Sequence, residues 1–187
     1  MLTNMTFDAF DEFFDILSAS FPKEEYRPYA AQKRLFDKAE YGILILPYAD
    51  VAETNADGKT IAAFLALWDF GTFAYLEHFA VRSELRSMGL GARLLKEAGE
   101  RLKKPLVLEC EPHGANEMAD RRIAFYERNG FVLNEYPYIQ PSMGEGRDPI
   151  PLMLMTSPSA IDEETFAFYR GTLYEKVYET LDKKERV

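Results

Sequence analysis

The chain of 187 residues has little cysteine, histidine or tryptophan: one cysteine, two histidines and one tryptophan. The single cysteine, Cys110, excludes an internal disulfide, which fits a reducing cytoplasm. The two histidines stand at no metal-ligand spacing, so we predict no metal site. No apolar run reaches the roughly 18 residues that a membrane helix needs, and the acidic start of the chain is unlike a signal peptide. We therefore expect a cytoplasmic protein without a metal and without a membrane partner.

Positive charge is also scarce, because 22 lysines and arginines face 31 aspartates and glutamates, a net charge of -9. This balance argues against nucleic acid as a partner, since binding to phosphate backbones needs a basic surface. Residues 82–104 have the opposite charge balance, with seven basic residues against three acidic ones. A basic segment in an acidic chain indicates a site for a multiply charged anion. The alternative is a solvated helix whose basic last turn suits the helix dipole.

The order of apolar patterns, glycines and prolines predicts the α/β class, with a mixed sheet covered by helices. A chain of this length with 47% hydrophobic residues can bury one sizeable core. The pair Asp57-Gly58 is typical of a hairpin turn. Helices are expected at 7–21, 29–39, 89–103, 120–129 and 162–181, strands at 41–46, 60–68, 73–81, 106–110, 131–133 and 150–155, and a Pro- and Gly-rich loop at 136–149.

The stretch RSMGLGARLL, residues 86–95, places Gly89 and Gly91 at the start of an expected helix. Glycine is a poor helix former, so the pair indicates that an anion approaches the backbone closely. The stretch lacks the GxxxxGK pattern of a nucleotide P-loop. It also lacks the first glycine of the dinucleotide pattern GxGxxG, because Ser87 stands there. What remains is Arg86-x-x-Gly89-x-Gly91 directly after a strand.

This pattern resembles the GCN5-related N-acetyltransferase (GNAT) superfamily, whose signature (Gln/Arg)-x-x-Gly-x-(Gly/Ala) lies between a strand and a helix. The preceding strand YLEHFAV and the later stretch AFYERNGF match the family's strand and its tyrosine-bearing helix in order and spacing. The resemblance implies the GNAT acyltransferase fold for residues 1–156. It leaves residues 157–187 as a C-terminal helical extension.

The same resemblance implies acetyl-CoA as cofactor, held between the strands at 75–81 and 106–111. Main-chain groups of Phe79, Ala80 and Val81 would bind the pantetheine arm, and the glycine loop would bind the pyrophosphate. The residues of that loop are Arg86, Ser87, Met88, Gly89, Leu90 and Gly91.

The reaction implied is direct acetyl transfer to an amine, without a covalent enzyme intermediate. A lysine-like amine with a pKa near 10.4 is almost entirely protonated at neutral pH, so a base that takes its proton is needed. Glu77 is the predicted base, acting through water, unless it merely points to solvent; Glu109 and Glu111 are the alternatives. Since side chains alternate along a strand, His78 is expected to point away from Glu77 and to be structural.

Tyr126 stands where the family has the general acid that protonates the departing sulfur; the alternative is a core aromatic. The family often has an asparagine seven residues before this tyrosine, where it contacts pantetheine. Ala119 stands there, and Asn116 is the candidate to take over the contact. Cys110 is expected to be a small buried residue and not a nucleophile.

The acceptor is expected to be an amine of a small molecule or peptide, which the sequence does not identify. Two other functions stay open: a non-catalytic acyl-CoA-binding or interaction protein on the same fold, and transfer of a larger acyl group. The C-terminal helix carries an aromatic stripe, which either covers its own domain or joins a homodimer. The stripe consists of Phe166, Tyr169, Tyr174 and Tyr178.

Overall fold

The computed structural model describes residues 1–51 and 58–180, so part of the expected turn at Asp57-Gly58 lies outside the described residues. Seven strands have the hydrogen-bonded order β1-β2-β3-β4-β5-β7-β6 and are accompanied by helices, which confirms the predicted α/β class with a mixed sheet. The residues group into two compact units. The first comprises Met1–Pro22 and Pro28–Val107, and the second Lys23–Arg27 and Leu108–Val187.

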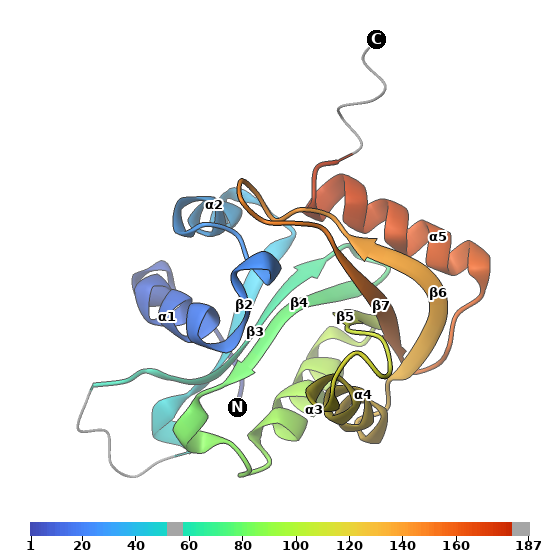
Figure 1. Ribbon diagram of the computed structural model, residues 1–187. Coiled ribbons are helices and arrows are strands. Elements are labelled where there is room, and N and C mark those ends of the chain that lie inside the picture. The colour runs from blue at the N-terminus through green and yellow to red at the C-terminus, as the bar shows by residue number, and fades with distance from the viewer. Residues whose placement is uncertain (52–57, 181–187) are drawn as a thin grey trace. The chain divides into compact units, whose positions relative to one another are not determined.

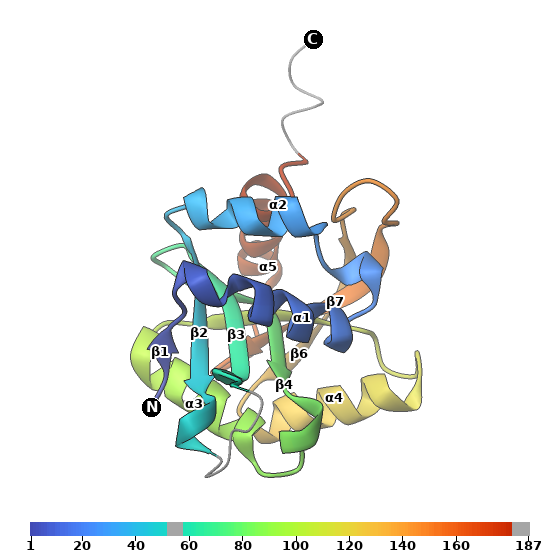
Figure 2. The same ribbon diagram turned by 90° about the vertical axis from the view of Figure 1, so that its left-hand side faces the viewer.

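The first unit is an antiparallel set of strands between helices. Figure 1 shows β2, β3 and β4 side by side, and in Figure 2 α1 lies over one face of these strands and α3 behind them. Every residue of β3 from Ile61 to Trp68 is buried, as expected for a strand covered on both faces. The elements are β1 (Thr3–Asn4), α1 (Phe10–Ser20), α2 (Tyr29–Arg34), β2 (Tyr41–Pro47), β3 (Ile61–Asp69), β4 (Ala74–Val81) and α3 (Leu90–Leu102).

The second unit contains the antiparallel pair β6 and β7, with Val132 opposite Thr156 and Gln140 opposite Ile150. The register shifts between Asn134 and Tyr138, around a proline that cannot donate to the ladder. The elements are β5 (Leu106–Cys110, of which the last three residues belong to this unit), α4 (Glu117–Arg128), β6 (Val132–Gln140), β7 (Ile150–Ser157) and α5 (Glu163–Thr172), which continues as a π-helical turn (Leu173–Val177).

The expectation of an irregular loop from 136 onward was wrong, because β6 continues to Gln140. The proline at this point favoured a loop in the sequence, whereas the structure accommodates it at the register shift. The helix expected from 120 begins earlier, at Glu117, since the Asn116 side chain caps it.

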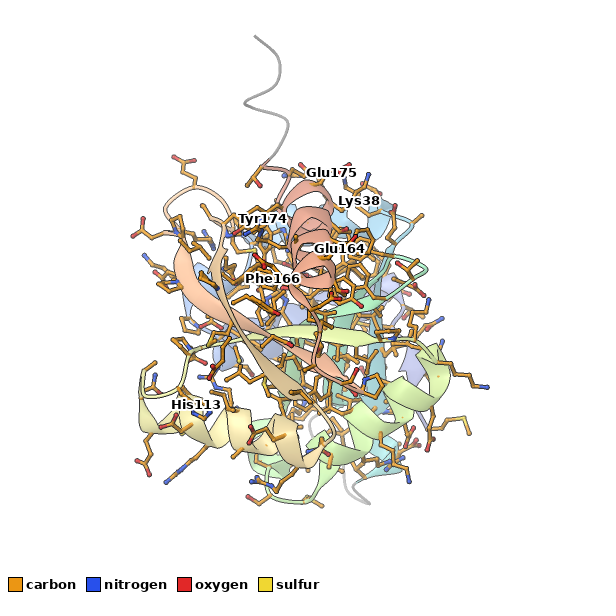
Figure 3. All side chains as sticks on the ribbon, turned by 90° about the vertical axis from the view of Figure 1, so that its right-hand side faces the viewer. Lys38, His113, Glu164, Phe166, Tyr174 and Glu175 are labelled. Atoms are coloured by element: carbon orange, nitrogen blue, oxygen red, sulfur yellow. The ribbon has the colours of Figure 1, made fainter. Side chains whose placement is uncertain are left out.

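The C-terminal helix α5 packs on β6 of its own chain. Figure 3 labels Phe166 and Tyr174 along it, and the ring of Phe166 stacks on Tyr136 with 4.7 Å between centroids. The Tyr174 hydroxyl donates to the Ile139 carbonyl oxygen over 2.6 Å. The buried residues of this segment are Phe166, Tyr169, Leu173, Val177 and Tyr178. Most of the aromatic stripe is therefore covered by the chain itself, and a homodimer stays a prediction.

Among the helices that the structure describes, none combines the length and the apolar character needed to cross a bilayer.

Candidate functional site

The loop before α3 has the backbone that an anion site requires. Gly89, the residue that begins the helix, has φ +74° and its backbone is therefore left-handed; Ser87 also has a positive φ of 66°. No side chain caps this helix, and its first turn contains no acidic residue. By contrast, α4 and α5 begin with the side-chain caps Asn116 and Asp162 and with acidic first turns. The N-terminal N–H groups of α3 and its positive dipole end are thus not met by a carboxylate of the helix's own cap or first turn.

Gly89 has two physical reasons to be glycine. The sequence indicated the first, the close approach of an anion to the backbone, and the structure adds the second, a left-handed backbone. Its positive φ disfavours any residue with a Cβ. An added Cβ would also meet no atom within 4 Å among the described residues, so the space beside this backbone is open to a ligand. Arg86 is exposed next to this turn, and its Nε donates to the Val81 carbonyl oxygen over 3.4 Å. A guanidinium and uncapped N–H groups in one turn are groups that could hold a phosphate.

A β-bulge in β4 decides how Glu77 and His78 lie. Ala66 pairs with His78 and Leu67 pairs with Leu76, which leaves Glu77 as the extra residue. The side chains of Glu77 and His78 are 0% and 1% exposed, and Oε2 of Glu77 lies 3.7 Å from Nδ1 of His78. The expectation that these side chains point to opposite faces was wrong, because a bulge breaks the strand alternation. The alternative that Glu77 points to solvent was also wrong.

The main-chain groups predicted to hold pantetheine lie in the last part of β4. Phe79, Ala80 and Val81 pair in register with Leu65, Phe64 and Ala63 of β3. Ala80 is buried, whereas its two neighbours are half-buried.

In the second unit, Glu111 and Arg122 lie close enough to Tyr126 to act on it electrostatically, and they act in the same way on Glu25, a residue that the sequence did not single out. Arg122 Nη2 donates to Glu111 Oε1 over 2.8 Å. Burial, and secondly the negative charge of Glu111, raise the pKa of Glu25 to about 7. Glu25 lies in a connection between helices, where its sequence neighbours give no hint that the fold buries it.

Tyr126 lies near the C-terminal end of α4, and its ring centroid is 5.8 Å from that of Phe131. Desolvation raises the pKa of the Tyr126 hydroxyl well above its usual range, although the charge of Arg122 acts in the opposite direction. The hydroxyl is therefore protonated at every pH at which the protein would work. It can donate a hydrogen bond or a proton.

Cys110 is buried, as predicted. Burial, followed by the negative charge of Glu111, raises the pKa of its thiol to about 12. Only the thiolate is a good nucleophile, so this residue is unreactive at neutral pH.

Glu109, one of the alternative bases, is engaged in a hydrogen-bond cluster. The Tyr178 hydroxyl lies 2.8 Å from both carboxylate oxygens, and the Tyr138 hydroxyl also donates to Oε1. The cluster anchors the C-terminal segment to β5, which gives Glu109 a structural role.

Asn116, the candidate pantetheine contact, has a role of its own in the fold. Its Oδ1 accepts a 2.9 Å hydrogen bond from the backbone N–H of Ala119, which caps α4. Ala119 is fully buried. In the ranges 1–51 and 58–180, no three His, Cys, Asp or Glu residues gather in a way that could hold a metal ion.

Comparison with known proteins decides the family. The sequence model described as "Acetyltransferase (GNAT) family" matches residues 8–131, about two thirds of the chain. The chain belongs to this family. A Bacteroides thetaiotaomicron structure named "Putative acetyltransferase from GNAT family" is 35% identical, with 95% of this chain and 98% of the other covered and a TM-score of 0.81.

Two further similar proteins are more distant. "Putative acetyltransferase YjbC" of Bacillus subtilis is 24% identical over 91% of this chain and 83% of its own length. Arabidopsis thaliana NAA60 shares the fold at 12% identity and a TM-score of 0.64, over 83% of this chain and 96% of its own; its structure is a complex with acetyl-CoA. The cofactor predicted from the sequence is thus the one bound in a structural relative.

Proposed function

We propose that this GNAT protein transfers the acetyl group of acetyl-CoA directly to an amine of a small molecule or peptide. The observation that carries the proposal is the start of α3, where a left-handed glycine, an uncapped helix N-terminus and Arg86 meet without a carboxylate in the first turn. A pyrophosphate carries the charge and the acceptor oxygens that such a turn binds.

The residues that would hold the cofactor fit its chemistry. Backbone groups of residues 79–81 would bind the pantetheine amides, and the loop from Arg86 to Gly91 would bind the pyrophosphate. The Oδ1 of Asn116 already serves the helix cap, so a contact to the cofactor would come from its Nδ2. When bound, acetyl-CoA supplies the acetyl group as an activated thioester.

Tyr126 is proposed to donate a proton to the departing sulfur. What supports this role is the position of Tyr126 on α4, which matches the family's tyrosine-bearing helix. Its hydroxyl is protonated at neutral pH and so has a proton to donate. Donation by a positioned acid is worth about 10²–10⁴-fold in rate.

The resemblance assigns the base to Glu77, and this remains a proposal. Its carboxylate is buried beside His78, so it would need a water molecule that enters with the acceptor. Glu109 and Glu111 are less suitable, because Tyr178 holds the first and Arg122 holds the second.

Thiol release from acetyl-CoA, measured with a panel of amines and with mass analysis of the products, tests the proposal. An acetylated amine is the expected product. Tight binding of acetyl-CoA without turnover of any amine would favour the non-catalytic alternative. Faster release from longer acyl-CoA thioesters than from acetyl-CoA would favour a larger acyl group.

A further inference from the structure

The short segment Lys23–Arg27 is fixed to the second unit on both sides of Glu25. The Glu24 carbonyl oxygen accepts from Gln140 Nε2 over 3.4 Å, and the Tyr26 carbonyl oxygen accepts from Arg147 Nε over 2.6 Å. Arg27 is buried, and its Nη2 donates over 2.8 Å to a carbonyl oxygen of the C-terminal segment. These bonds come from three separate parts of the chain, so the backbone of Glu25 is held in one place.

The charged groups that act on Glu25 come from three elements. They are Glu111 after β5, Arg122 of α4 and the neighbouring Glu24. Arg122 is paired with Glu111, so with both glutamates ionised the trio Glu25, Glu111 and Arg122 has one excess negative charge. The side chain of Glu25 is desolvated by this packing, yet the residue is only half-buried. Burial of the Glu25 carboxyl is partial, whereas the side chain of Glu77 is fully enclosed, so Glu25 is the better placed of the two to meet a ligand.

The same surroundings include the proposed sulfur donor. Glu25, Glu111 and Arg122 all act electrostatically on the Tyr126 hydroxyl. A carboxylate and a tyrosine with opposite proton-transfer tasks thus belong to one cluster of the second unit. An excess negative charge in this cluster attracts a cationic group.

We infer that Glu25 is the general base of the acetyl transfer, the group that takes a proton from the ammonium form of the acceptor amine. This inference rests on the proposed function. Glu25 takes the place of Glu77 as the base that deprotonates the acceptor.

The proton balance is complete with these groups. Glu25 takes one proton from the ammonium and passes it to solvent. The amine nitrogen then forms a bond to the acetyl carbon, and the carbon–sulfur bond breaks. The sulfur receives a proton from Tyr126, and the second proton lost by the nitrogen restores the tyrosine. One hydrogen stays on the amide product.

The pKa of Glu25 fits this step, because a base is most effective when its pKa is near the working pH. Below about pH 7 the carboxyl is protonated and cannot accept a proton. The rate constant kcat/KM for the amine should therefore rise about tenfold per pH unit and level off near pH 7.

The test compares full-length wild type, Glu25→Gln, Glu77→Gln and the matched control Glu24→Gln in thiol release from acetyl-CoA with primary amines, across this pH range. Glu25→Gln is expected to lose about 10²-fold in kcat/KM at neutral pH and to bind acetyl-CoA normally. It should also lose the bend, the point near pH 7 at which kcat/KM stops rising with pH. Glu24→Gln should keep the rate and the bend, with at most a small shift of the bend to lower pH, because Glu24 is the weakest of the charges that act on Glu25. If Glu25→Gln does not fold, Glu25→Asp should keep the bend at a lower rate.

A bend that survives in Glu25→Gln, or that disappears in Glu77→Gln alone, overturns the role of Glu25 and leaves the proposed function intact. Wild-type protein that binds acetyl-CoA but acetylates no amine overturns the proposed function, and the base role with it.

Discussion

Arg122 Nη2 donates to Glu111 Oε1 over 2.8 Å, and the two partners of this ion pair act on Glu25 in opposite directions. The carboxylate of Glu111 raises the pKa of Glu25, and the guanidinium of Arg122 lowers it. The pair can therefore tune the protonation of Glu25 near neutral pH.

Removing either partner should move the pH profile of the reaction in a predictable direction. Glu111→Gln removes a like charge and releases Arg122, so the bend in kcat/KM should move down by about one pH unit. Arg122→Met leaves two carboxylates uncompensated and should move the bend up by a similar amount. Shifts in the same direction, or none, would show that the bend belongs to another group.

Stability should depend on Glu25 in a pH-dependent way. The pKa is about 7 in the folded chain against an ordinary value of 4.5, so the folded state binds this proton more tightly. Ionisation of Glu25 therefore destabilises the fold as the pH rises through this interval. Above it, Glu25→Gln should be more stable than wild type by about 2–3 kcal/mol.

Urea unfolding at about pH 8 and at about pH 4 measures this difference, which should nearly vanish at the lower pH, where the wild-type carboxyl is neutral. Glu24→Gln serves as control. An equal effect of Glu25→Gln at both pH values would mean that packing, not ionisation, is responsible.

The glycine loop can be tested with a matched pair of substitutions. Gly89→Val and Gly71→Val both force a β-branched residue into a left-handed backbone, φ +74° and +80°, with open space around the added Cβ. Both should lose similar stability, but only Gly89→Val should weaken acetyl-CoA binding, by at least about tenfold, the value of one charge-assisted hydrogen bond. Calorimetry on the folded variants decides, and equal affinity in both variants would remove the loop from the site.

Local patterns predicted α3 well, since its apolar stripe is periodic and Pro105 follows it; the helix ends at Leu102. They did not predict the bulge at Glu77, because a bulge depends on how the partner strand pairs. The proposed phosphate loop could be found in the sequence for the same reason as α3: its glycines and arginine stand within one short stretch.

Glu25 could not be found this way. Its raised pKa comes from burial and from Glu111, 86 positions further along the chain. The anchoring of Glu109 by Tyr178 is equally non-local, so the sequence left Glu109 open as a base. Residues whose function depends on distant contacts carry no local signal.

The hydroxyl of Tyr178 should matter more for stability than that of Tyr174. Tyr178→Phe removes a donor from the Glu109 carboxylate and should cost about 1–3 kcal/mol of unfolding free energy. Tyr174→Phe removes a hydrogen bond to an exposed carbonyl and should cost about 1 kcal/mol or less. Denaturant unfolding compares them, and equal losses would deny Glu109 its anchoring role.

A chain ending at residue 158 lacks this anchor altogether and exposes the surface that α5 covers, so it should aggregate. Sedimentation of both lengths also tests the homodimer. A soluble, stable monomer at both lengths would contradict a structural role for the C-terminal helix.

Tyr126→Phe should lower turnover by at least about tenfold while acetyl-CoA binds almost normally. The substitution keeps the ring and its contact with Phe131 and deletes only the hydroxyl. Since a thiol with a pKa near 8.5 is a tolerable leaving group, its protonation should help without being indispensable. Tyr136→Phe is the matched control, because its hydroxyl donates to the Ile161 carbonyl oxygen over 3.2 Å and has no catalytic task. Full activity in Tyr126→Phe would assign the sulfur's proton to water and leave Tyr126 as a packing residue of α4.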